Sequence, residues 1–157
     1  MNLLILLSML LGQEPTFPDA DPKPAIEAAK KKATAENRRV LVLWGTNDHE
    51  ATQAALKLLK KDKEVSRVML YEYDLVLAGF QRLKDQSPDS TCPCLVITDA
   101  TGKELSKSAA PVDSKAMLEL LNKHKAEPWN AKEVLAAAMK RAAEEKKRVL
   151  LTFGAPW

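Results

Sequence analysis

The chain has 157 residues, of which 46% are hydrophobic and 29% are charged, so its size and composition are those of one globular domain. Its net charge of +3 comes from 24 Lys and Arg residues mixed with 21 Asp and Glu residues, which argues against the basic surface of a nucleic-acid binder. Two cysteines are too few for a disulfide-stapled scaffold.

The first eleven residues form an almost unbroken apolar run that ends at Gly12. As a helix they would rise only about 16 Å, roughly half of a bilayer core, so no stable membrane span is predicted. We expect residues 1–12 to be a secretory signal peptide, which would make the protein secreted or periplasmic. The alternative is an N-terminal helix buried in the fold. The Pro-rich residues 13–23 favour the signal peptide, because such a linker would separate that helix from the domain.

Helix and strand patterns alternate after this linker. Residues 24–36 predict a helix, and its apolar face carries Ile26, Ala29 and Ala33. Residues 39–44 are a short apolar run rich in Val and Leu, which is typical of a central strand covered on both faces.

A second helix is predicted after a turn at residues 45–48. Asn47 and Glu50 have the spacing of a capping box, which indicates a helix that extends to Lys61. Its buried stripe is expected to contain Ala51, Ala55, Leu58 and Leu59.

Three further patterns follow along the chain. Residues 65–74 predict a second strand, after which Val76, Phe80 and Leu83 have helical spacing. Residues 94–99 predict a third strand, which the turn sequence at 99–102 joins to residues 103–107 as an antiparallel hairpin.

A final amphipathic helix is predicted at residues 112–124. Its inward face is expected to carry Ala116, Met117, Leu120 and Leu121. The complete order of elements predicts an α/β fold with a central mixed sheet, helices on both faces and parallel first strands.

Residues 24 to about 125 resemble the thioredoxin superfamily. The resemblance rests on the strand Val40-Leu41-Val42-Leu43-Trp44 after a helix, the turn at Asn47, and Thr91-Cys92-Pro93 before the strand and Gly102 hairpin. It implies a thioredoxin-like three-layer sandwich, with thiol-disulfide exchange as the family activity. In that family a W-C-x-x-C motif follows the first central strand and faces a cis-proline loop. The resemblance therefore makes Thr91, Cys92 and Pro93 the cis-proline loop.

The sequence also contains an internal repeat with an offset of 109 residues. Residues 148–154 align with residues 39–45, and the helix pattern at 134–145 aligns with 25–36. The chain then ends Phe153-Gly154-Ala155-Pro156-Trp157, which looks like the lead-in to the family's W-C-x-x-C motif. We expect residues 126–130 to be a linker and residues 131–157 to begin a second thioredoxin-like domain, truncated before its cysteines. The alternative is a real terminus whose last residues add an edge strand to the first domain.

Under the repeat alignment, His49 and Thr52 replace the two cysteines of the family motif in the first domain. Neither side chain can exchange disulfides, and a solvated or capping role is the simplest interpretation of His49. The low-ranking redox candidates are Cys92 and Cys94, whose spacing in an extended segment would allow only a strained disulfide. Two packed, inert thiols are the other interpretation.

The sequence predicts no cofactor and no metal. It contains no Gly-rich phosphate loop, no nucleophile elbow and no paired-His motif, and two cysteines with a distant His provide at most three metal ligands. The expected partners are protein thiols and disulfides or a peptide substrate, with no nucleic acid.

Two functions remain open at this point. The intact protein resembles a thioredoxin-family oxidoreductase that maintains cell redox homeostasis, with its redox pair beyond Trp157. The alternative is a non-catalytic thioredoxin-like binding or structural module. In either case we expect no strong catalysis from the 157 residues themselves.

Overall fold

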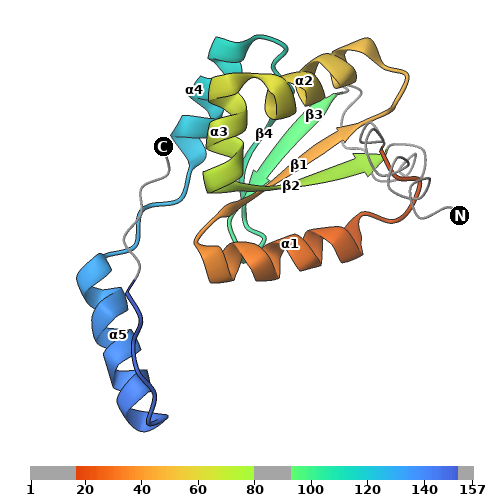
Figure 1. Cartoon of the computed structure of the whole chain (residues 1–157). Helices are drawn as coiled ribbons and strands as arrows, with labels where there is room; N and C mark the ends of the chain where they lie inside the picture. The colour runs from red at the N-terminus through yellow and green to blue at the C-terminus, as the bar shows by residue number, and fades with distance from the viewer. Residues whose placement is uncertain (1–16, 80–92, 152–157) are drawn as a thin grey trace, which may run out of the picture.

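The computed structural model describes residues 17–79 and 93–151. It contains one sheet, made of β1 (Arg39–Gly45), β2 (Tyr73–Gly79), β3 (Cys94–Thr98) and β4 (Glu104–Ala109). The strand order is β2-β1-β3-β4, with β1 parallel to β2 and antiparallel to β3 (Figure 1). β3 and β4 form an antiparallel hairpin. The mixed sheet, its parallel first strands and the hairpin confirm the predicted fold class.

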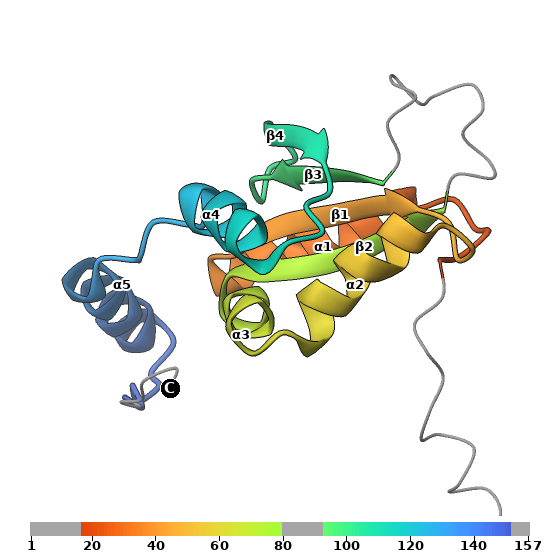
Figure 2. The same cartoon turned by 90° about the horizontal axis from the view of Figure 1, so that it is seen from above.

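Helices cover both faces of this sheet. The described residues form α1 (Lys23–Glu36), α2 (Glu50–Lys61), α3 (Lys63–Glu72), α4 (Ser114–His124) and α5 (Ala131–Glu144). α1 packs on one face, while α2, α3 and α4 pack on the other (Figure 2). The result is the predicted three-layer arrangement. None of these helices has the length and apolar character needed to cross a bilayer.

The central strand β1 divides the core into two clusters. Val40 and Val42 point toward α1, whereas Leu41 and Leu43 point toward α2, α3 and α4. All four side chains are buried, because alternate residues of a strand face opposite sides and both sides are covered. This explains the continuous apolar run in the sequence.

The predicted strand at residues 65–74 is wrong, because most of this stretch forms α3. The carboxylate of Asp62 accepts hydrogen bonds from the backbone N–H groups of Glu64 and Val65 and so caps the helix. Val65 and Met69 are buried on one side of α3, with a spacing of one helical turn. The cap and this spacing outweigh the strand preference of the valines.

β2 begins at Tyr73, eight residues after residue 65, where the second strand was predicted to begin. The Tyr73 hydroxyl donates a 2.6 Å hydrogen bond to the backbone oxygen of Leu121 in α4, which ties the start of the strand to the helix layer. Val76, predicted on a third helix, lies instead within β2. Phe80 and Leu83 are outside the described residues.

The buried faces of α2 and α4 differ in detail from the predicted ones. In α2 the fully buried residues are Thr52, Ala55, Leu56 and Leu59, while Ala51 and Leu58 are half-buried. In α4, Met117 and Leu121 are buried, Leu120 is half-buried and Ala116 is exposed. Both helices are thus rotated slightly about their axes relative to the prediction.

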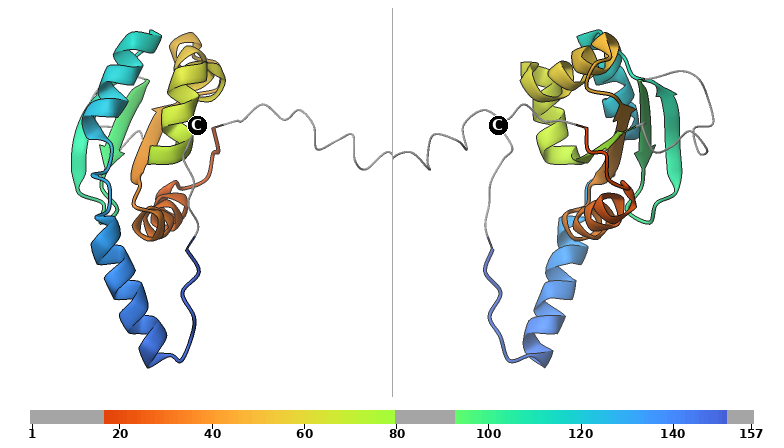
Figure 3. Two further views of the ribbon diagram at one scale, coloured as in Figure 1. Left: turned by 60° about the vertical axis from the view of Figure 1, so that its left-hand side comes forward. Right: turned by 90° about the vertical axis from the view of Figure 1, so that its right-hand side faces the viewer.

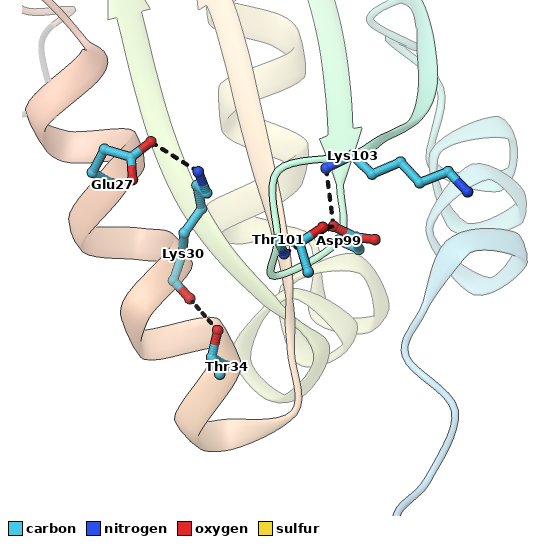
Figure 4. A network of polar contacts seen from close by, with 6 residues as sticks. All are labelled: Glu27, Lys30, Thr34, Asp99, Thr101 and Lys103. Atoms are coloured by element: carbon cyan, nitrogen blue, oxygen red, sulfur yellow. Dashed lines mark hydrogen bonds and ion pairs between the residues drawn. The ribbon is translucent and has the colours of Figure 1, made fainter.

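The hairpin turn between β3 and β4 is organised by one carboxylate. Asp99 Oδ1 accepts hydrogen bonds from Thr101 N (2.9 Å), Thr101 Oγ1 (2.6 Å) and Lys103 N (3.0 Å), as Figure 4 shows. Gly102 has φ 95°, and Lys30 of α1 passes about 3.0 Å from where a Cβ would lie. A side chain at this position would therefore be strained and crowded.

α5 lies apart from the sheet (Figure 3). It buries none of its residues, and residues 148–151 after it form no strand. In the described part of the chain, these residues therefore do not add an edge strand to the first domain. The division into two domains remains a prediction.

Candidate functional site

The candidate site lies at the edge of the sheet where β1 ends and β3 begins. Because these strands are antiparallel, with Trp44 opposite Cys94, the turn after Gly45 lies beside Pro93. Pro93 is buried, and its carbonyl oxygen accepts a 2.9 Å hydrogen bond from Ala110 N. The fold thus brings Pro93 to the same end of the sheet as Gly45, which Thr52 of α2 contacts. Thr91 and Cys92 lie outside the described residues.

His49 and Thr52 occupy the first turn of α2, facing different surroundings. His49 is the N-cap residue and is exposed, and its imidazole makes no capping hydrogen bond. Thr52 is completely buried. Of the two predicted positions at the N-terminus of α2, His49 is therefore accessible and Thr52 is buried. Neither side chain is a thiol.

Thr52 packs directly against the end of β1. A Cβ atom at Gly45 would lie 2.8 Å from Thr52 Oγ1 and closer still to its methyl group, so only glycine fits at this point. The Thr52 hydroxyl has no hydrogen-bond partner among the described residues. This packing holds the first turn of α2 against the end of β1. The Thr52 hydroxyl adds no hydrogen bond to this contact.

The predicted capping box does not form, because Asn47 has a different partner. Asn47 Oδ1 accepts a 2.8 Å hydrogen bond from the backbone N–H of Phe17, and Asn47 Nδ2 donates to the Phe17 carbonyl at 3.4 Å. Phe17 is only 5% exposed and belongs to the main core. Part of the predicted 13–23 linker therefore contacts the domain. The sequence feature that could have indicated this contact is Phe17 itself, a single aromatic residue between Pro15 and Pro18.

A small pocket of about 160 Å³ opens at the same edge. Its lining includes Phe17, Asp19, Thr46 and Asp48. The pKa of Asp48 is below its usual range, first because Thr46 donates a side-chain hydrogen bond and then because of a backbone bond and the nearby His49 charge. The described residues contain no group of three or more potential metal ligands.

Cys94 is the cysteine that the structure describes. It is a free, half-buried thiol at the first position of β3, opposite Trp44. Burial raises the pKa of this thiol, and Lys107 offsets the effect only in part. Because the thiolate is the nucleophile in disulfide exchange, such a site favours the unreactive form at neutral pH.

Comparison with solved structures identifies the architecture. The chain is similar to a disulphide isomerase from Xylella fastidiosa Temecula1, with a TM-score of 0.61 and 14% identity, over 71% of this chain and 96% of that one. The chain has a thioredoxin-like fold. A thioredoxin from Thermus thermophilus is also similar, with a TM-score of 0.50 and 18% identity, over 65% of this chain and 82% of that one.

The structural similarity establishes the fold. At 14% and 18% sequence identity it does not establish an activity, which must be argued from the residues of the site. No family model matches the sequence, and no curated protein matches it. The thioredoxin-like fold here places His49, Thr52 and Pro93 together at one edge, whereas Cys94 lies one residue inside β3.

Proposed function

We propose that the thioredoxin-like domain binds an extended protein segment at the edge formed by Pro93 and the first turn of α2, without exchanging disulfides there. The observation that carries this proposal is the pair His49 and Thr52, an exposed imidazole and a buried hydroxyl at the N-terminus of α2. An accessible helix N-terminus beside a strand end can contact a peptide backbone, but disulfide exchange at these two positions would need thiols.

The binding proposal is tested with an unfolded protein that has no free thiol. We would titrate the ¹⁵N-labelled full chain with reduced, carboxymethylated α-lactalbumin and follow amide shifts. We expect shifts at Gly45, His49 and Cys94 and none at Lys107 in β4. Shifts distributed evenly over the sheet, or none at the α2 edge, would contradict the proposal.

Pro93→Ala and Pro128→Ala are compared in this test. Pro93 lies at the proposed edge, whereas Pro128 is an exposed linker residue next to Glu127, which is bonded to Asn37 before the opposite end of β1. We expect Pro93→Ala to weaken binding and Pro128→Ala to bind as the unmodified chain does. Circular dichroism spectra check that both variants are folded.

Thiol-disulfide exchange is the second candidate, with protein thiols or disulfides as partners. It is favoured by the repeat, because residues 153–157 resemble the lead-in to a W-C-x-x-C motif, and by the position of Cys94 beside the candidate edge. The redox pair would lie beyond Trp157 or consist of Cys92 and Cys94. Thiol titration with mass mapping, followed by insulin reduction, separates these cases. Two slowly reacting thiols and no turnover would exclude the local pair.

We also propose that the protein is secreted or periplasmic. The apolar residues 1–12 support export, and cleavage after residue 12 would keep Phe17 and the rest of the described core. N-terminal sequencing of the exported protein tests this. A start near Gln13 is expected, and retention in the cytoplasm with Met1 intact would contradict it.

A further inference from the structure

Residues 17–22, here called the strap, cross the end of the sheet and join its two faces. Phe17 is buried in the main core, on the side of α2, α3 and α4. Pro22 is also buried and is the N-cap residue of α1 on the opposite face. Between these two residues the strap passes the end of β2, as Figure 1 and Figure 2 show.

The strap lies close to β2 because the last residue of that strand is a glycine. A Cβ atom at Gly79 would lie 2.5 Å from the backbone carbonyl oxygen of Pro18. Any larger residue at this position would push the strap away from the sheet. The strap is therefore fitted to the end of β2 as well as anchored in the core.

Asn47 binds the strap through both polar atoms of its amide. Its Oδ1 atom accepts a 2.8 Å hydrogen bond from Phe17 N, and its Nδ2 atom donates to Phe17 O at 3.4 Å. One side chain thus pairs with both main-chain groups of one residue, as a residue of a neighbouring antiparallel strand would. Since the Phe17 ring is buried, these main-chain groups are held in place, and they hold Asn47 in turn.

The turn at residues 46–49 is held from α2 on its other side. Gln53 Nε2 donates a 2.9 Å hydrogen bond to the carbonyl oxygen of Asn47. The Asn47 side chain therefore binds the strap, while its main chain binds the helix. The turn ends at His49, the exposed residue of the proposed peptide site.

The strap and the turn enclose open space between them. Phe17 and Asp19 of the strap and Thr46 and Asp48 of the turn line the pocket of about 160 Å³ described above. The amide of Asn47 bridges the strap and the turn beside this space. The position of the turn should therefore depend on these two hydrogen bonds.

The strap and Pro93 lie on opposite sides of β1. The strap crosses the end of β2, which pairs with one edge of β1, whereas Pro93 precedes β3, which pairs with the other edge. The strap therefore does not take the place of a segment bound between Pro93 and α2. It supports the turn at 46–49 from behind.

We propose that the strap is a positioning element of the peptide site, in which Asn47 and Phe17 fix the turn at 46–49 in the conformation that binds an extended protein segment. This inference rests on the proposed function. Residues 47–49 are exposed, so without the strap the turn would sample several conformations, and binding would carry the entropic cost of ordering it. The strap removes that cost in advance.

The test compares the Kd for reduced, carboxymethylated α-lactalbumin between the unmodified full chain and its variants. Asn47→Ala removes both hydrogen bonds at an exposed position, so the domain is expected to stay folded. We expect the Kd to rise about five- to tenfold, which is the effect of about one lost hydrogen bond. Phe17→Ala removes the anchor of the strap and should raise the Kd by a similar factor. Circular dichroism spectra check the folding of both, and Asn47→Ala is sufficient if Phe17→Ala does not fold.

Tyr73→Phe is the matched control for a loss of stability. It also removes one hydrogen bond from a side chain to the backbone, that between the Tyr73 hydroxyl and Leu121 O, at the opposite end of β2 from Gly79. We expect Tyr73→Phe to lower the unfolding free energy and to leave the Kd unchanged. A rise in Kd as large as that of Asn47→Ala would show that affinity merely follows stability, and would overturn the positioning role.

The double variant Asn47→Ala with Phe17→Ala distinguishes positioning from direct contact with the bound segment. If the two residues act through their mutual contact, the double variant should bind no more weakly than the weaker-binding single variant. Two factors that multiply in the double variant would overturn the coupling through the strap.

Spectra without any ligand separate this inference from the proposed function. The ¹⁵N heteronuclear NOE reports picosecond to nanosecond motion, and we expect it to fall at Thr46, Asp48 and His49 in Asn47→Ala but not at Lys107. No binding by the unmodified chain would overturn the proposed function. An unchanged Kd in Asn47→Ala, or unchanged NOE values in its turn, would overturn the role of the strap.

Discussion

Thr52 is a buried polar residue in the first turn of α2. It fills the buried position of the first turn and touches Gly45, yet its hydroxyl has no partner among the described residues. A buried polar group without a hydrogen bond is destabilising, so the hydroxyl is not explained by stability alone.

Thr52→Val tests this account because it keeps the shape and removes the hydroxyl. We expect the free energy of unfolding to rise by about 1 kcal/mol, since no hydrogen bond is lost and a desolvation cost disappears. Thr34→Val is the control, because its hydroxyl is exposed and donates to Lys30 O at 2.9 Å. Urea unfolding measures both. A loss of stability in Thr52→Val would show that the hydroxyl has a partner in solution.

A double substitution tests whether these positions match the cysteines of the family motif. In a background without Cys92 and Cys94, His49→Cys with Thr52→Cys should form a reversible disulfide and reduce insulin, because the helix N-terminus lowers the pKa of the first thiol. Glu50→Cys with Gln53→Cys has the same spacing one residue further along. Equal activity in both pairs would contradict the assignment.

At the scale of elements, short polar side chains join neighbouring segments. Asp62 caps α3 and also accepts a 2.7 Å hydrogen bond from Ser114 Oγ at the start of α4. Asn47 joins the turn after β1 to Phe17. Each contact links segments far apart in the sequence, which local patterns alone do not reveal.

The Asp62 contact predicts a pH dependence of stability. The Ser114 hydroxyl, followed by the backbone N–H groups of α3, holds the pKa of Asp62 below its ordinary value of 3.8. A depressed carboxyl pKa stabilises the folded state above the unfolded pKa, and this contribution is lost as the pH falls through the folded pKa. The unfolding free energy should therefore fall as the solution is acidified below about pH 4.

Ser114→Ala should reduce the part of this pH dependence that comes from Asp62, because it removes the largest cause of the pKa shift. Ser66→Ala, within α3, is the control. Urea unfolding at neutral pH and near pH 3 measures the difference for each variant. An unchanged pH dependence in Ser114→Ala would show that the hydroxyl does not set the Asp62 pKa.

At the scale of the whole molecule, the described chain consists of a packed sandwich and the exposed helix α5. Met117 of α4 is completely buried in the main core, whereas Met139 of α5 is 60% exposed. The domain should therefore owe its stability to residues before the linker.

Two matched substitutions test this division. Met117→Ala should lower the unfolding free energy by about 2–5 kcal/mol, because it removes buried surface and leaves a cavity. Met139→Ala should change the stability of the sandwich by no more than about 0.5 kcal/mol. Urea unfolding measures both changes. Similar losses in both variants would show that α5 packs on the domain.

The elements that the sequence predicted well are those whose local pattern and tertiary burial agree. α1, β1 and the hairpin carry strong local signals, namely a helical apolar face, a continuous Val and Leu run, and turn residues around Gly102. α3 was missed because its valines suggested a strand, while Asp62 at its N-cap was the decisive residue. Of the candidate site, the first-turn positions and the loop proline were predicted, and Phe17 was not.

The sequence by itself determined the fold class, the helix α1 and the central strand β1. These are properties of residue type and spacing, which depend on no distant contact. The tertiary structure alone decided that Thr52 is buried while His49 is exposed, that Asn47 binds Phe17, and that β2 follows α3 and pairs in parallel with β1. Each of these depends on which segments the sheet brings together, and that pairing is set by packing over the whole molecule.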